Sequence, residues 1–450
     1  MNVQGKLLLT SLMRFSILRL PRLALLLLLG TILLLPWTIP LGAQGRPGVP
    51  ADLQALITEA LQANPEIKEK SQLKTASKES IHPAGSLDDP KFSFNILALP
   101  VNTWAFNEWD MTQKQLALSQ KFPFPGKLRL RSEVAEEQSR SDEFSHQDKI
   151  NEIRTRVIQG YWTLSLAYAS YDITLKNKHW WEQVVQVAET RYAVGRGLQA
   201  DVLQAQVELG GYLDRLFKWR QSQESVQADL NALRSQPPGT PIPRPQALQA
   251  RTFTLKLANL LKMAADQPRL QALQAKVAKQ GKAVDLARKD FFPDFTVGLA
   301  YGLRESVPTR ERPDFFSSSF TVNVPIWQRN KLKPRVREQQ ARKAAAQDAY
   351  RAAVDRLNAA IKDRFEILQR LAEQIKLYGQ GIIPQARQAA ESSLAAYQAG
   401  ALDFATLSQN FIALYNAELK WQEYLKNFEG TWAEMEWLVG QELPRIGAAG

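Results

Sequence analysis

The chain has 450 residues, of which 45% are hydrophobic and 23% charged, with a formal net charge of +12 and no cysteine. This composition is typical of a folding chain and argues against a disordered protein and a polytopic membrane protein. The lack of cysteine excludes disulfide scaffolds, thiolate metal sites and cysteine nucleophiles. The bases form no stripe interleaved with aromatic residues, so nucleic acid is not an expected partner.

Motifs of the common enzyme classes are missing from the sequence. It contains no H-E-x-x-H, no G-x-S-x-G and no Walker loop. The G-x-G at Gly195 to Gly197 lacks the preceding strand and the third glycine of a dinucleotide-binding turn. The three histidines and Met111 are scattered, and we expect them to be ordinary residues rather than ligands. We therefore predict no enzyme activity, no cofactor and no metal site.

Residues 1–43 are predicted to be a secretory signal peptide. Four bases precede the uncharged run Leu23 to Leu35, and Gly42-Ala43 provides small residues for cleavage. The alternative is a retained anchor, because Leu23 to Leu41 could nearly cross a bilayer; Pro36 and Pro40 argue against it. No later stretch of 18 residues is apolar throughout, so no further membrane-spanning helix is expected.

The rest of the chain is an internal duplication. Pro65 and Pro268 each open a helical stretch and lie 203 residues apart, as do Pro90 and Pro293, which precede alternating runs. Each repeat is predicted to contain a helix, two strands and two very long helices. The predicted segments are a first repeat at 44–235, a Pro-rich linker at 236–247, a second repeat at 248–440 and a tail at 441–450.

Alternating runs predict two strands in each repeat, at about 91–99 and 112–122 and at about 294–303 and 316–325. Residues such as Phe295, Val297 and Leu299 alternate with small or polar ones, which gives one apolar face and one polar face. A sheet whose apolar face covers a core is one interpretation. A lipid-facing barrel is the other, and it is favoured by the length of the runs and by loop aromatics such as Trp104 and Trp109.

Apolar residues spaced by three and four predict a long helical hairpin in each repeat, at about 127–235 and 329–438. A continuous helix from Lys127 to Arg191 would extend about 98 Å. Gly195 would then let the chain reverse, and Gly400 would do so in the second repeat. A soluble coiled-coil spacer is the alternative, but it does not explain two strand pairs in phase with two helical rods.

Four strands are too few to close a barrel, since the smallest stable barrels have about eight. An open strand edge in lipid would leave backbone groups without hydrogen-bond partners, at several kcal/mol each. If the strands meet lipid, chains must therefore associate. Three copies would supply a 12-stranded barrel and 12 helical rods.

The ordered elements and motifs resemble the TolC-type outer-membrane efflux family over nearly all of the mature chain. The matching pieces are Asn64-Pro65, Asp89-Pro90, Gln120 to Leu128, Phe292-Pro293-Asp294 and Pro325-Ile326-Trp327. The Phe-Pro-Phe-Pro-Gly-Lys stretch, with Trp109-Asp110-Met111 upstream, is most similar to the cation-efflux branch of CusC-like and CzcC-like proteins. Many relatives of that branch carry a lipidated cysteine after the signal, and this chain has no cysteine to lipidate.

The resemblance implies a mainly α fold with a small β part. It implies a homotrimer whose 12-stranded β-barrel lies in outer-membrane lipid and continues as a 12-helix α-barrel in the periplasm. The implied function is the exit duct of a tripartite efflux system. Cargo, with heavy-metal cations as the candidate, would pass from an inner-membrane pump of the resistance-nodulation-division type and a periplasmic adaptor to the outside. The alternative is a periplasmic coiled-coil adaptor or scaffold protein, which should have one rod and a lipoyl-like domain.

The resemblance also assigns the turns between the long helices to periplasmic tips that contact the adaptor. The corresponding positions are Arg191, Tyr192, Gly195, Tyr397 and Gly400, and the candidates for an acidic ring at the aperture are Asp201 and Asp403. The second tip has Ser392 or a nearby alanine where the first has an arginine before its tyrosine, so unequal contacts are expected. Each aspartate is alternatively a solvated turn residue or a helix cap. Unless paired, for example with Arg196, an aspartate at the aperture would favour opening.

Overall fold

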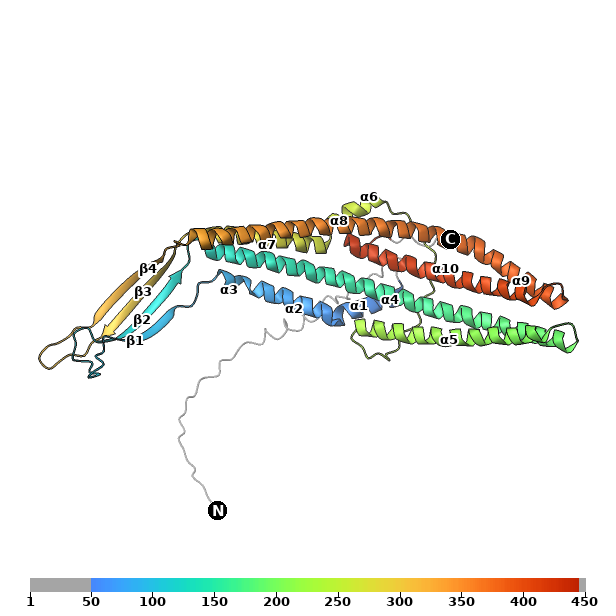
Figure 1. Ribbon diagram of the computed structural model, residues 1–450, viewed down its shortest axis with the longest axis horizontal. Helices are drawn as coiled ribbons and strands as arrows, with labels where there is room; N and C mark the ends of the chain where they lie inside the picture. Colours follow the sequence, from blue (N-terminus) through green and yellow to red (C-terminus); the bar gives the residue numbers. More distant parts are fainter. Residues whose placement is uncertain (1–49, 445–450) are drawn as a thin grey trace, which may run out of the picture. The chain divides into compact units, whose positions relative to one another are not determined.

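The computed structural model describes residues 50–444, which form long helices and one four-stranded sheet (Figure 1). The predicted signal peptide and the last six residues of the predicted tail lie outside these residues. The order helix, strand, strand, long helix, returning helix occurs twice, so the predicted mainly α, duplicated fold is confirmed.

The first repeat contains α1 (Ala51–Ala63), α2 (Pro65–Glu79), α3 (Ile81–Gly85), β1 (Lys91–Leu97), β2 (Gln113–Phe122), α4 (Lys127–Ala193) and α5 (Gln199–Leu233). The second contains α6 (Leu257–Met263), the 3₁₀ turn η1 (Ala264–Asp266), α7 (Pro268–Lys289), β3 (Asp294–Leu303), β4 (Phe315–Asn323), the π-helical turn η2 (Gln328–Leu332), α8 (Lys333–Leu377), the π-helical turn η3 (Tyr378–Ile382), α9 (Ile383–Ala399) and α10 (Phe404–Val439). Residues 236–256 between the repeats form neither helix nor strand.

In both repeats, a helix that precedes the strands begins with a side-chain cap followed by proline. The Asn64 side chain accepts hydrogen bonds from the amides of Glu66 and Ile67 at the start of α2, and Pro65 occupies the first turn. Gln267 accepts from the amide of Leu270 at the start of α7 in the same way. A side-chain cap followed by proline satisfies amides that have no partner within the helix.

The sheet is antiparallel in the order β1-β2-β3-β4, which leaves one edge of β1 and one edge of β4 unpaired. The register aligns Phe94, Leu116, Tyr301 and Phe316 across all four strands, so their side chains lie on one face. These side chains are exposed, and no core among residues 50–444 covers them. The interpretation of the sheet as one that covers a core of its own chain is therefore wrong.

The two sequence motifs at the strand exits meet where the sheet joins the helices. The rings of Phe124 and Phe292 stack with centroids 4.6 Å apart. The buried Lys127 ammonium lies 2.7 Å from a carboxylate oxygen of Asp294, which also accepts from the amide of Phe124. The charged pair joins the start of α4 to the start of β3, so the two repeats are connected at this point.

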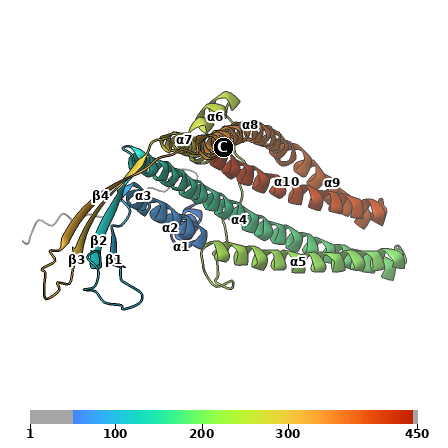
Figure 2. The same ribbon diagram turned by 60° about the vertical axis from the view of Figure 1, so that its left-hand side comes forward.

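The helices form two sets, one next to the sheet and one farther from it, and α4 runs through both. Near the sheet, α2 packs on α4, α4 on α7 and α7 on α8. Beyond it, α5 packs on α4, α4 on α10 and α10 on α9, and both views show the two antiparallel hairpins side by side (Figure 2). Apolar side chains form two core clusters: one packs α1, α4, α8 and α10 together with the end of α5, and the other lies between α4, α5, α9 and α10 nearer the turns that end the hairpins. Among residues 50–444, no helix is both long and apolar enough to cross a bilayer.

Candidate functional site

The turns at the ends of the two hairpins have the same backbone structure. Gly195 has φ +69° and Gly400 has φ +78°. The residue after each glycine donates its amide to the carbonyl five residues earlier: Arg196 to Arg191 at 2.8 Å, and Ala401 to Ala396 at 2.9 Å. This pattern ends a helix on a left-handed residue, a conformation that costs other residues more than glycine. Arg191 therefore occupies the position that Ala396 occupies in the second tip.

Arg191, Asp201 and Tyr397, which we call the tip cluster, join the two hairpins. The guanidinium of Arg191 donates to the carbonyl oxygen of Tyr397 and lies 4.4 Å from the centroid of its ring. The Tyr397 hydroxyl donates to a carboxylate oxygen of Asp201 at 3.2 Å. Arg191 comes from the end of α4, Asp201 from the first turn of α5 and Tyr397 from the end of α9.

Tyr397 is the buried member of the tip cluster, with 1% of its surface exposed. Its ring packs edge-on against Phe404 and belongs to the core cluster that also contains Trp181 and Phe411. Burial, together with the charge of Asp201, raises the pKa of Tyr397 to about 12. The hydroxyl therefore keeps its proton at neutral pH and remains a donor to Asp201. A cation over the face of a tyrosine ring contributes about 0.5 to 2 kcal/mol, and more where water is excluded.

The other predicted tip residues lie outside this cluster. Tyr192, which matches Tyr397 in the first repeat, is 50% exposed. Asp201 is not paired with Arg196, whose side chain makes no ion pair within residues 50–444, but with Tyr397. Asp403 caps α10: its carboxylate accepts from the Thr406 amide at 2.8 Å, and this hydrogen bond lowers the pKa of Asp403.

A second polar contact between the hairpins was not predicted from the sequence. Glu418 on α10 lies 2.9 Å from the guanidinium of Arg387 on α9 and 3.6 Å from the ammonium of Lys176 on α4. Its side chain is nearly buried. The sequence does contain a sign of this contact. Glu418 stands in the apolar seam of α10 between Leu414 and Trp421, at a position where spacings of four and three predict an apolar residue.

The sequence matches a known protein family over most of its length. Residues 56–235 and 260–441 match the family described as outer membrane efflux protein, one segment for each repeat. The chain belongs to this family. It is therefore an outer-membrane efflux protein of the TolC type, and its long helices are the periplasmic extension. The alternative of a periplasmic adaptor or scaffold is wrong, because the family match and the two hairpins both contradict it.

Solved structures share the fold at low sequence identity. CusC is 15% identical with a TM-score of 0.74, covering 87% of this chain and 93% of CusC. VceC from Vibrio cholerae is 20% identical with a TM-score of 0.74, covering 87% and 97%. The open state of MtrE from Neisseria gonorrhoeae is 15% identical with a TM-score of 0.71, covering 87% and 89%. No protein of curated function matches the sequence.

The described side chains do not offer a binding site for a metal cofactor. No group of three or more histidines, aspartates and glutamates within residues 50–444 is arranged to hold a metal ion. The tip cluster contains one carboxylate, one guanidinium and one phenol that donates to the carboxylate. Such a set of noncovalent contacts can hold two helices together and can also separate.

Proposed function

We propose that this efflux protein is the exit duct of a tripartite system and conducts passively as a homotrimer. The observation that carries the proposal is the exposed apolar face of a sheet with two unpaired edges. The helices near the sheet are arranged in the same way as the strands. They pack in the order α2, α4, α7, α8, so α2 and α8 each have one side without a neighbour in this row. Pairing β4 with β1 of the next copy would satisfy both strand edges, and three copies would bring twelve strands, enough to close a barrel.

Surfaces near the tips support association on the same two sides. Helix α5 exposes the large apolar side chains Leu203, Val207 and Phe217, while α9 exposes the small residues Ala389, Ser392, Ala395 and Ala399. Helices α5 and α9 are the outer members of their row. Large apolar residues on one copy facing small residues on the next would pack closely.

We further propose that the tip cluster holds the duct closed. Widening the aperture by moving one hairpin relative to the other must break the contacts of Arg191 and Asp201 with Tyr397. A periplasmic adaptor, docked on exposed tip residues such as Tyr192 and Val194, would compensate for these lost contacts. An inner-membrane pump would then deliver cargo through the opened tips. Asp403, as a cap of α10, would maintain the helix end rather than form the contact that opens.

The test is single-channel conductance of the purified protein in a planar bilayer. Arg191→Gln removes the charge over the Tyr397 ring and should raise the conductance or the open fraction several-fold, since about 1 to 2 kcal/mol of closing free energy is lost. Arg196→Gln is the matched control, because its side chain lies in the same turn without an ion pair in the described chain. Equal conductance of both variants and the wild type would contradict the closing role of the tip cluster.

We propose heavy-metal cations as the cargo class, on the similarity of the stretch Phe122 to Lys127 to the cation-efflux branch. The test compares a deletion strain with the same strain carrying the gene, in media containing copper, silver or zinc salts and in media containing organic antibiotics. Restored growth with metal salts alone supports metal export. Restored growth with antibiotics alone contradicts it and leaves the duct proposal unaffected.

A further inference from the structure

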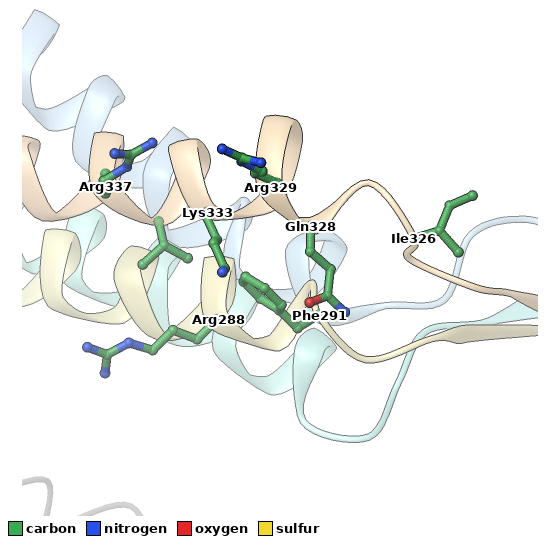
Figure 3. A pocket seen from close by; sticks show the side chains of 8 residues that line it. Arg288, Phe291, Ile326, Gln328, Arg329, Lys333 and Arg337 are labelled. Atoms are coloured by element: carbon green, nitrogen blue, oxygen red, sulfur yellow. The ribbon is translucent and has the colours of Figure 1, made fainter.

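A basic cavity lies where the sheet joins the helices, on the α7 and α8 side. It has a volume of about 910 Å³ and is bounded by the C-terminal end of α7, by η2 and by the first turns of α8. Figure 3 shows Arg288 and Phe291 coming from α7 and the segment after it, and Arg329, Lys333 and Arg337 coming from η2 and α8, with Lys333 pointing toward α7. Ile326, directly after β4, completes the lining on the side of the sheet.

The positive charges of this cavity are largely uncompensated. Arg288 lies 3.4 Å from Asp285. Within residues 50–444, Arg329, Lys333 and Arg337 have no carboxylate at ion-pair distance. They recur every four residues along η2 and the first turns of α8. Cations in the first turns of a helix also face the positive end of its dipole. All four basic side chains are exposed, so they are accessible to an anion that enters the cavity.

The cavity is continuous with the apolar face of the sheet. Val324 and Ile326 continue the alternation of Phe320 and Val322 beyond the end of β4, and Ile326 and Trp327 are each 68% exposed. Exposed tryptophan and apolar residues next to bases are typical of the level at which a membrane protein passes from lipid tails to headgroups. Because the strands lie in the outer membrane and α8 in the periplasm, this level is that of the periplasmic leaflet.

We propose that this cavity binds the phosphate headgroup of an anionic phospholipid of the periplasmic leaflet, such as phosphatidylglycerol. The guanidinium groups of Arg329 and Arg337 donate hydrogen bonds in pairs to phosphate oxygens, and the Lys333 ammonium supplies a point charge between them. The acyl chains follow Ile326 and Val324 toward the exposed face of the sheet. A bound headgroup then fixes the height of the strand exits relative to the membrane surface.

The position of the cavity argues against a neighbouring copy of the chain as its occupant. It is lined by both α7 and α8, which pack on each other, so it lies over a closed seam and not at the free edge of α8. A neighbouring copy joined to β4 through its β1 would carry Asp88 and Asp89 near the exit of β4. Those two carboxylates directly precede β1 in the sequence, and a variant lacking them enters the test.

The experiment is native mass spectrometry of the purified full-length protein in detergent, with phosphatidylglycerol or phosphatidylcholine of identical acyl chains added. The wild type should retain phosphatidylglycerol preferentially. The triple variant R329Q/K333Q/R337Q should lose that retention by about tenfold or more, since each base near a membrane surface contributes about 1 kcal/mol. The control variant R356Q/R370Q/K376Q removes three exposed bases farther along α8 and should retain the lipid as the wild type does.

Each other outcome contradicts the proposal in a defined way. Equal retention of the two lipids shows that the cavity does not recognise a charged headgroup. Displacement of phosphatidylglycerol by millimolar inorganic phosphate shows a site for a free anion and not for a lipid. Selectivity that arises only in D88N/D89N identifies the occupant as the acidic segment of a neighbouring copy. Circular dichroism of the triple variant establishes that it is folded, so a loss of binding is not a loss of structure.

Discussion

The two hairpins are copies of one design that differ at their middle and at their tip. In the first, α4 is a single helix of 67 residues, about 100 Å long. In the second, the corresponding helix is divided by the π-helical turn η3, which contains Gly379 and Gly381. The first tip supplies Arg191 and Asp201, whereas the second supplies Tyr397, the residue that both contact.

This difference assigns distinct mechanical roles to the hairpins. An uninterrupted helix resists bending, while π-helical turns and glycines are the usual places where helices bend. The chain therefore combines a stiff hairpin that carries two polar groups with a hairpin that can bend and carries their common partner. Movement of the second hairpin about η3, away from the first, is the displacement that would separate the tip cluster.

The largest expected effect comes from removing the buried tyrosine of the second tip. Tyr397→Ala deletes a core side chain and should lower the local free energy of unfolding by about 3 to 5 kcal/mol. The matched Tyr192→Ala removes a half-exposed side chain and should cost less than about 1 kcal/mol. Hydrogen exchange of peptides from α9 and α10 measures both. Similar losses of protection in the two variants would show that the tips are energetically equivalent.

The next effect tests what the tips have in common. Gly195→Ala and Gly400→Ala each place a Cβ atom on a residue with positive φ, at a cost of about 1 to 2 kcal/mol. Nothing lies within 4 Å of the added atom at Gly195, and at Gly400 the nearest atom is the Arg191 guanidinium at an ordinary 3.6 Å. Both variants should therefore lose protection of the turn amides equally. A much larger loss at Gly400 would mean that the added methyl displaces Arg191.

Sequence periodicity was sufficient for the fold because its signals are local or repeated. Alternation marked the strands, spacings of three and four marked the long helices, and the shared 203-residue offset showed that one unit occurs twice. The strand register and the neighbours of each helix were not accessible in this way. A heptad pattern specifies which face of α4 is apolar, but it does not specify that this face packs on α10.

In the tip cluster, too, the sequence predicts the residues but not their contacts. The sequence predicts Arg191, Asp201 and Tyr397 as tip residues and offers Arg196 as a partner of Asp201, whereas the partner in the structure is Tyr397. Arg191 and Tyr397 are 206 residues apart, and their contact depends on the packing of Trp181 and Phe411 between α4 and α10. The turn η3 was also missed, because five residues of π-helix do not change the apolar spacing enough to be recognised.

A smaller effect is expected at the bend of the second hairpin. Gly381→Ala adds a methyl in ordinary contact with Leu377 and should stabilise this segment by about 1 kcal/mol through helix propensity. Gly379→Ala places its methyl 3.1 Å from Nε1 of Trp421, which donates to the carbonyl of Ile375, so crowding should cancel the gain. Slower exchange in the η3 peptide of Gly381→Ala, with reduced single-channel opening, is the expected result. Unchanged opening in a stiffened variant would contradict bending at η3.

The smallest effect separates the cap at Asp403 from the buried contact at Tyr397. Hydrogen bonds from the Thr406 amide and hydroxyl lower the pKa of Asp403 below its ordinary 3.8. Its stabilising contribution is therefore complete above that ordinary value and is lost as pH falls through the lower folded value. Asp403→Asn keeps a good helix cap that does not titrate in this range. Protection of the first turn of α10 should fall on acidification in the wild type and stay more nearly constant in Asp403→Asn, whereas parallel losses in both would place the acid-sensitive group elsewhere.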